Sequence, residues 1–425
     1  MIRNRNKINY VKIQSIFLRG LNLSILFLTT IYIARILGPE EYGRYSVYLS
    51  TFNLLTIPFM TGISTFLVRE VSKADDVELR IKPILYSKNI LIYFAIFLTI
   101  GFIGYGLYNG FNRFLILGLL YSIFCAISGA FSSILRGVKK VILSFTTELV
   151  VRPIIVAILV LFISRVYKLS GEYVLTIQTL SYLLITLILV ILTKKEINWT
   201  NKYWVLNTGY TGYNKTISLL LLLSLLQLSN NYSDILFLKA FRENIDVGIY
   251  RAISQLGSTM LIGLMAINQV IQPQIDTLLK KSTEELQKLI RNSWIYINIF
   301  SSFLGVILFL FAEKLLIVLF NYDYATQDAV ITFRIYIIGM LINTFFGSVG
   351  TILNMTHNEY LTIRGMILGI ISNLVLNLFL VPTYGMIGTA ISSATTLLVW
   401  NFVLWWYTLN KIRINSIGIF NFSKK

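Results

Sequence analysis

The chain has 425 residues, of which 56% are apolar and 13% are charged, and its formal net charge is +18. Soluble domains carry about 25% charged residues, so these charges are too few to cover a water-soluble protein of this size. A soluble enzyme and a disordered chain are therefore excluded. Cys125 is the single cysteine and His357 the single histidine, which excludes a disulfide scaffold and a histidine metal cluster. A polytopic membrane protein is the class that remains.

Apolar segments long enough to cross a bilayer recur through the whole chain. A hydrocarbon core of about 30 Å needs about 20 apolar residues in helical form. This length predicts an all-α fold with about twelve transmembrane helices. They lie near residues 13–37, 43–66, 84–107, 113–135, 141–164, 172–193, 214–237, 247–271, 290–311, 328–354, 360–381 and 385–409.

The basic residues lie mostly in short loops between these segments, which favours orientation in a membrane over nucleic-acid binding as their cause. With the N-terminus placed in the cytoplasm, 22 basic loop and tail residues fall inside and 7 fall outside. This asymmetry predicts a multi-pass plasma-membrane protein with both termini in the cytoplasm.

Two motifs recur at equivalent places in the two halves of the chain. Segments that begin at Gly43 and Gly248 each open the second helix of a half, and segments that begin at Ser133 and Thr351 each close the fourth. Duplicated halves of transporters form two bundles around a substrate path. We therefore predict two pseudo-symmetric six-helix bundles around a central cavity. The expected parts are a basic cytoplasmic tail (1–12), an N-terminal bundle (13–193), a cytoplasmic linker (194–213), a C-terminal bundle (214–409) and a cytoplasmic tail (410–425).

Polar side chains recur at helical spacing on the first two helices of each half. One such stripe could simply join helices through hydrogen bonds. Four stripes on repeat-related helices favour an aqueous cavity. The residues expected to line it are Asn22, Ser50, Asn53, Gln227, Asn231 and Gln255.

Charged residues inside the spans need a reason, because an arginine at the bilayer centre costs about 2.5–3.5 kcal/mol on insertion scales. Arg152 lies near the middle of its span, one turn after Glu148 and directly before Pro153, which should kink the helix. In one interpretation, Glu148 pairs with Arg152 and so lets the helix insert into the membrane. In the other, Arg152 faces the cavity, and Glu148 releases it when an anion or a proton arrives. Arg19 has no acidic residue within a turn and is expected to face substrate.

Three further charged residues are candidates of the same kind. Arg334 and Arg251 can also face substrate, although Arg251 lies near a helix end and could extend to the interface. Asp234 is a candidate ligand for a coupling ion or a sugar. The sequence has no GxxxxGK[ST] motif and no loop long enough for a catalytic domain. We therefore expect no enzymatic activity, no cofactor and no metal site, with energy from an H⁺ or Na⁺ gradient or from substrate supply.

Two segments resemble a known family. The run Ala34-Arg-Ile-Leu-Gly-Pro-Glu-Glu-Tyr-Gly-Arg-Tyr45 is similar to the segment after the first helix in the polysaccharide-transporter branch of the multidrug/oligosaccharidyl-lipid/polysaccharide (MOP) flippase superfamily. The run from Leu380 to Ala390 resembles a proline–glycine pattern before that family's last helix, with Thr389 where the family often has alanine. The resemblance implies a Wzx-type O-antigen flippase of a bacterial inner membrane, which moves undecaprenyl-diphosphate-linked oligosaccharide to the outer leaflet by alternating access.

This substrate fits the charged residues of the spans. A diphosphate needs cationic partners, and arginine binds phosphate oxygens in a fork while keeping its charge. The candidate headgroup ligands are Arg19, Arg152, Arg334 and Arg251, and Glu148 and Asp234 are the candidates for ion coupling. Expected partners are the lipid-linked glycan, membrane lipids and the polymerase and chain-length proteins of such a pathway, with no nucleic acid.

Two alternatives stay open from the sequence. A multidrug or cation antiporter of the same superfamily should carry more cavity acids than arginines, which this chain does not. A membrane-embedded polysaccharide polymerase or ligase, an enzyme, usually has a sizeable outer loop, whereas the longest loops here are expected to face the cytoplasm.

Overall fold

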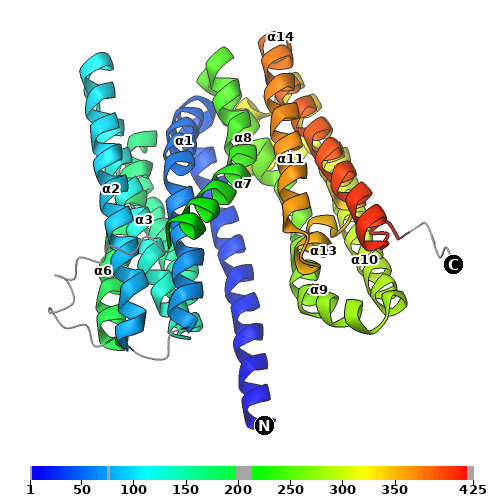
Figure 1. Ribbon diagram of the computed structural model, residues 1–425. Coiled ribbons are helices and arrows are strands. Elements are labelled where there is room, and N and C mark those ends of the chain that lie inside the picture. Colours follow the sequence, from blue (N-terminus) through cyan, green and yellow to red (C-terminus); the bar gives the residue numbers. More distant parts are fainter. Residues whose placement is uncertain (1, 74–76, 198–212, 419–425) are drawn as a thin grey trace. The chain divides into compact units, whose positions relative to one another are not determined.

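The computed structural model describes residues 2–73, 77–197 and 213–418, and within these ranges the chain is helical with short turns and no strand (Figure 1). The predicted all-α fold is confirmed. The helices of the first half are α1 (Ile2–Lys73), α2 (Val77–Asn109), α3 (Arg113–Gly137), α4 (Val141–Phe145), the π-helix η1 (Thr146–Val151), α5 (Arg152–Val166) and α6 (Gly171–Ile197).

The second half begins in α7 (Asn214–Phe241) and continues through shorter helices and one long one. These are α8 (Asn244–Gly257), the 3-10 turn η4 (Ser258–Met260), α9 (Leu261–Lys281), α10 (Thr283–Leu310), α11 (Ala312–Leu319), the 3-10 turn η5 (Tyr322–Tyr324), α12 (Gln327–Phe345), α13 (Val349–Met355), α14 (Glu359–Tyr407) and the π-helix η6 (Thr408–Ile412).

Among the described residues, eight helical stretches are long and apolar enough to cross a membrane. Two of them, Phe17–Lys73 and Glu359–Ile412, have 57 and 54 residues and can each cross twice. They bend at Gly38 (φ 74°) and Gly385 (φ 56°), a backbone region that glycine enters without steric cost. The eight stretches therefore hold ten of the twelve predicted spans.

The other two predicted spans, 214–237 and 247–271, lie in α7 and in α8–η4–α9. The second of these helices is interrupted at η4 and carries Arg251, Gln255, Gln269 and Gln272, so its hydropathy is lower.

The described residues divide into two compact units, each with its own core. Unit 1 comprises residues 1–37 and 44–228, and unit 2 comprises residues 38–43 and 229–425. The boundary after residue 228 falls inside α7. Of the predicted linker at 194–213, residues 198–212 lie outside the described residues, and 194–197 form the end of α6.

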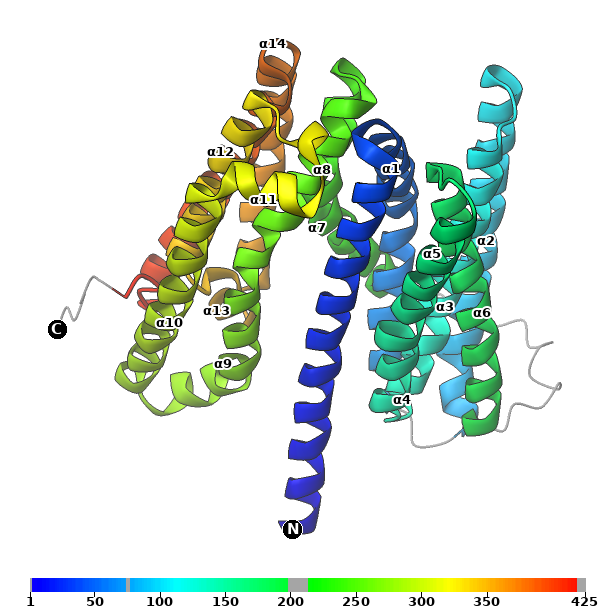
Figure 2. The same cartoon turned by 180° about the vertical axis from the view of Figure 1, so that it is seen from behind.

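In unit 1, α3 is the central helix and packs against α2, α4 and α6 (Figure 1). Ile63, Phe66 and Leu67 of α1 form a buried core with Ile84 of α2 and Ile134 of α3. In unit 2, α12 packs against α8, α10 and α14 (Figure 2). The polar residues of each unit are therefore positioned by helices that pack around that unit's own apolar core.

The short segment 38–43 of α1 belongs to unit 2, where it packs on the start of α8. A Cβ atom on Gly43 would lie 1.8 Å from the carbonyl oxygen of Asn244, and one on Gly248 would lie 1.9 Å from the carbonyl oxygen of Pro39. The absence of both side chains lets the two backbones touch.

Candidate functional site

The first candidate site surrounds Arg152 in unit 1. Arg152 begins α5 directly before Pro153, and the turn that precedes it is the π-helix η1. Proline lacks an N–H group and its ring crowds the carbonyl four residues earlier, so a regular α-turn is disfavoured here. The N–H of Arg152 instead donates to the carbonyl of Thr147, five residues back. The irregularity expected at Pro153 thus takes the form of one wide turn.

Neutral groups hold the Arg152 guanidinium. Its carbon lies 4.6 Å from the ring centroid of Tyr182, and its Nη1 donates to Oε1 of Gln178 over 3.5 Å. Gln178 in turn donates to the hydroxyl of Tyr45 over 3.4 Å. The Nε of Arg152 is buried without a hydrogen-bond partner. Within the described ranges no carboxylate forms an ion pair with Arg152, so its charge can meet an anion.

Glu148 does not neutralise Arg152 in this structure. Its carboxylate accepts a hydrogen bond from Ser132 of α3. The hydroxyl of Ser132 also lies 2.7 Å from that of Ser144. Both sequence-based interpretations start from a Glu148–Arg152 pair, whereas the acid of this structure is turned toward two serines. The role of Glu148 in coupling stays a prediction.

A second layer of polar and aromatic groups adjoins Tyr182. The ring of Tyr121 meets that of Tyr182 edge-on at 5.2 Å, and the Tyr121 hydroxyl donates to Oδ1 of Asn53 over 2.9 Å. Asn53 was expected to line a cavity and is half-buried in this network. Ser50, one turn before it on α1, is buried.

The other predicted residues of unit 1 lie on the first part of α1. Arg19 is exposed, and its guanidinium carbon lies 5.1 Å from the ring centroid of Phe145. Asn22 is half-buried and its Oδ1 has no hydrogen-bond partner. The structure thus brings Arg19 and Arg152 into one unit, on different helices.

Arg251, Gln255 and Arg334 belong to unit 2. Arg251 and Gln255 lie one turn apart on α8, and both are half-buried. Arg334 is exposed on α12, with its guanidinium carbon 5.3 Å from the ring centroid of Phe309. Gln227 and Asn231 lie in α7, but their side chains are outside the described part of the chain.

The second candidate site is a hydrogen-bond cluster around Asp234 in unit 2. Its Oδ1 accepts from Asn373 over 3.0 Å and from Asn377 over 3.2 Å. Its Oδ2 accepts from Tyr250 over 3.0 Å and from Ser393. Four donors on α8 and α14 therefore converge on one carboxylate.

The sequence interpretation singled out Asp234 but not its partners. Asn373 and Asn377 stand four residues apart on one face of a predicted span, and both are buried. Two amides at that spacing inside a membrane helix are costly unless they are hydrogen-bonded. This cost is the feature of the sequence from which a hydrogen-bond partner for the two amides could have been predicted. Their pairing with Asp234, about 140 residues earlier in the chain, cannot be read from helical periodicity.

The Asp234 cluster also contains acceptors. Asn373 accepts from Ser233 over 2.9 Å and from Asn377 over 3.0 Å. Oδ1 of Asn377 is buried with no hydrogen-bond partner. Carboxylate, amide and hydroxyl oxygens are the ligands that hard cations take. Within the described ranges, no group of three or more His, Cys, Asp or Glu side chains could hold a metal ion.

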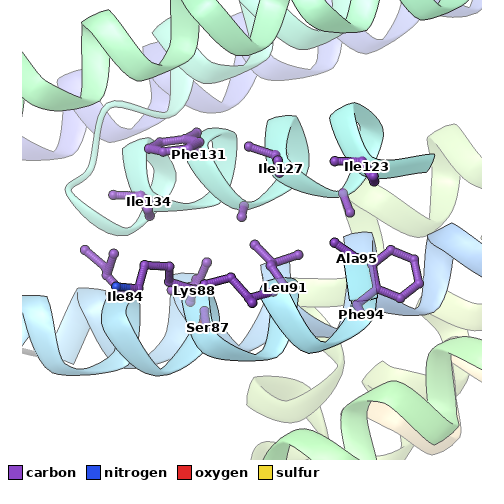
Figure 3. Close-up of a pocket in the computed structure, with 14 residues that line it drawn as sticks. Ile84, Ser87, Lys88, Leu91, Phe94, Ala95, Ile123, Ile127, Phe131 and Ile134 are labelled. Atoms are coloured by element: carbon purple, nitrogen blue, oxygen red, sulfur yellow. The ribbon is translucent and has the colours of Figure 1, made fainter. Parts of the chain in front are cut away.

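A groove of about 240 Å³ lies in unit 1 between α2 and α3, with Leu67 of α1 also lining it (Figure 3). Its walls are apolar, with Ser87 and Lys88 the polar residues among those that line it. None of the candidate site residues lines this groove. Its chemistry fits hydrocarbon rather than a charged headgroup.

The model of a family described as polysaccharide biosynthesis protein matches residues 15–279, which is more than half of the chain. The chain belongs to this family. The resemblance seen in Ala34–Tyr45 is thereby confirmed. No curated protein sequence matches this polysaccharide biosynthesis protein.

Solved structures share the fold of this polysaccharide biosynthesis protein at low sequence identity. An inward-facing multidrug resistance MATE family transporter of the MOP superfamily is 13% identical, with a TM-score of 0.74 over 95% of this chain and 98% of the other. The lipid II flippase MurJ is 13% identical, with a TM-score of 0.68 over 93% and 86%. A MOP superfamily transporter from Pyrococcus furiosus is 13% identical, with a TM-score of 0.65 over 95% and 94%. The chain therefore shares the fold of these multi-pass membrane transporters.

Proposed function

We propose that this protein is a flippase that moves an undecaprenyl-diphosphate-linked oligosaccharide, such as an O-antigen repeat unit, from the inner to the outer leaflet of a bacterial inner membrane. Both termini lie in the cytoplasm in this proposal, and the protein acts by alternating access as a transporter rather than as an enzyme. The family and the fold shared with a lipid II flippase support a lipid-linked substrate.

The observation that carries the proposal is the environment of Arg152. A guanidinium inside a membrane helix is held there by a phenol ring and an amide, with its Nε unpartnered. Burying a charge without a counter-charge is expensive. A bound anion would offset the free-energy cost of burying this guanidinium. The planar guanidinium group can bind two phosphate oxygens at once. A cation-exporting antiporter would be expected to have an acid at such a place.

For coupling, we propose that Asp234 binds Na⁺ or H⁺ within its cluster. The carboxylate, the unpartnered Oδ1 of Asn377 and the hydroxyls of Ser393 and Tyr250 form a set of oxygens on three helices of unit 2. Helices joined at one ion can shift when it leaves, which is how an ion gradient could drive unit 2 between two arrangements.

The test is export of surface glycan in cells that lack their own copy of the chain and carry a plasmid-borne variant. Arg152→Ala should lower surface glycan about tenfold or more, because one charge-assisted contact is worth about 1.5–3 kcal/mol. The matched control is Arg165→Ala, an exposed arginine in the last turn of the same helix. This variant should export normally.

Immunoblots of the membrane fraction must show equal protein levels for both variants. If cells with Arg152→Ala carry as much surface glycan as wild-type cells, Arg152 does not bind the headgroup as proposed. Accumulation of lipid-linked oligosaccharide on the cytoplasmic leaflet distinguishes a failed flippase from a failed polymerase, which would leave single repeat units on the outer leaflet.

A further inference from the structure

Two arginines flank one aromatic ring at the end of unit 1 where α3 passes into α4. The guanidinium carbon of Arg19 lies 5.1 Å from the ring centroid of Phe145, and that of Arg136 lies 5.8 Å from the same centroid. The two guanidinium carbons are therefore at most about 11 Å apart, the sum of these distances. Figure 2 shows α4 toward the end of unit 1 from which α1 starts. With the proposed orientation, this end faces the cytoplasm.

Arg136 is not required to close its helix. The last carbonyls of α3 are already bonded by backbone amides, since Val138 donates to Ile134 over 3.0 Å, Lys139 to Arg136 over 3.0 Å and Lys140 to Leu135 over 2.9 Å. A basic residue in a last turn can be explained by such carbonyls and by the helix dipole. Here that explanation is insufficient, because the Arg136 side chain turns back along its helix instead.

The Arg136 side chain has one hydrogen bond and no ion pair within the described residues, although the charge of Glu148 acts on it through space. Nη2 donates to the hydroxyl of Ser133 over 2.9 Å, and Nε is buried without a partner. In the portion that the structure describes, Arg136 has no ion pair, whereas the nearby Lys140 pairs with Glu196 at 3.1 Å. A half-buried guanidinium with an unpartnered Nε beside a second guanidinium is suited to an anion with more than one charge.

The Arg19–Arg136 pair lies between the proposed cytoplasmic end of unit 1 and Arg152. Phe145 precedes Arg152 by seven residues, about 10 Å along the helix axis. Glu148 falls between them in sequence and accepts a hydrogen bond from Ser132 of α3, and it forms no ion pair with Arg136 or Arg152 within the described residues. An anion bound at Phe145 would thus lie about two helical turns from Arg152 along the same helical stretch.

We propose that Arg136 and Arg19 form the first binding site for the diphosphate headgroup, from which it passes to Arg152. The inference rests on the proposed flippase function. Each phosphoryl group can take one guanidinium, and the aromatic face of Phe145 holds both arginines without an ion pair that would first have to break. Arg136 is thereby a headgroup-binding residue that determines how fast the substrate is captured.

The test uses the purified full chain in detergent micelles and a fluorescently labelled geranylgeranyl diphosphate, followed by stopped-flow mixing. Arg136→Gln should slow association about tenfold or more, because one charge-assisted contact is lost at the first encounter. Arg152→Gln should mainly accelerate dissociation. Lys139→Gln is the matched control, since it removes the same charge from an exposed side chain three residues away. It should bind as the wild type does.

Two further arms define the ligand and exclude misfolding. Inorganic diphosphate should displace the probe from the wild type and lose about tenfold in potency against Arg136→Gln if the headgroup itself is recognised. Geranylgeraniol, which lacks the phosphates, should not displace it. Arg136→Lys keeps the charge but not the fork, so it should restore part of the association rate if the variant's defect is electrostatic.

The outcomes separate this inference from the proposed function. Wild-type association and wild-type competition by diphosphate in Arg136→Gln would overturn the role of Arg136, even if Arg152→Gln is impaired. If the wild type binds the diphosphate probe no better than geranylgeraniol, the headgroup function itself fails, and Arg152 fails with it.

Discussion

Gly43 and Gly248 are in backbone contact within unit 2, and they begin the two motifs that we interpret from the sequence as a repeat. Neither has room for a Cβ atom, because each would overlap a carbonyl oxygen of the opposite segment, 1.8 Å away for Gly43 and 1.9 Å away for Gly248. Both motifs therefore mark the place within unit 2 where segment 38–43 meets α8.

Gly43→Ala should destabilise the protein by about 1–3 kcal/mol, the usual cost of overpacking. The added methyl group would push segment 38–43 away from α8. The thermal unfolding midpoint in detergent measures this. Gly101→Ala is the control, since a Cβ there meets nothing within 4 Å and alanine favours a helix. Equal midpoints for the two variants would contradict the close contact.

Asp234→Asn should abolish stabilisation by sodium. If Na⁺ binds the cluster, a concentration one hundred times its Kd stabilises the wild type by about 2.7 kcal/mol through mass action. The measurement is the unfolding midpoint in NaCl against choline chloride at equal ionic strength. Asp323→Asn, an exposed acid of the same unit, should keep the sodium effect. Equal unfolding midpoints of the wild type in the two salts would refute sodium coupling. Proton binding by Asp234 would then be the form of coupling that remains.

Tyr250→Phe should destabilise the protein by about 1.5–3 kcal/mol, the range for hydrogen bonds to charged groups, because the lost hydroxyl donates to Asp234. The same change at Tyr322, whose side chain is 79% exposed, should cost nothing measurable. A double-mutant cycle with Asp234→Asn tests the cause. In that background Tyr250→Phe should cost clearly less, and an unchanged cost would show that the tyrosine acts through packing alone.

Much of the fold follows from the sequence, because a membrane helix must satisfy its own backbone and has a fixed length. The spans, and the breaks at Gly38 and Gly385, lie where apolar length and the Gly-Pro and Pro-Thr-Tyr-Gly segments indicate them. Arg152 could also be singled out from the sequence, because the cost of burying it does not depend on which neighbours it has.

The contacts between individual side chains could not be predicted from the sequence in the same way. Glu148 stands one turn from Arg152, yet it bonds to Ser132, since a wide turn and the packing of α3 decide its direction. The amides that hold Asp234 come from α14, and the fold alone brings them there. Arg136 was counted only as a basic loop residue, because its contact with Phe145 depends on how α4 turns back.

The wide turn η1 has a consequence for chain length. A turn that bonds five residues back holds one residue more than regular winding needs, and such turns are rare outside functional regions. Loss of a single residue between Thr146 and Val151 could therefore be absorbed as ordinary α-helix, whereas the same loss within α5 would rotate everything beyond it by about 100°. Among related chains, a one-residue gap should fall in this turn, and those that carry it should keep the residue equivalent to Arg152 beside the same neighbours.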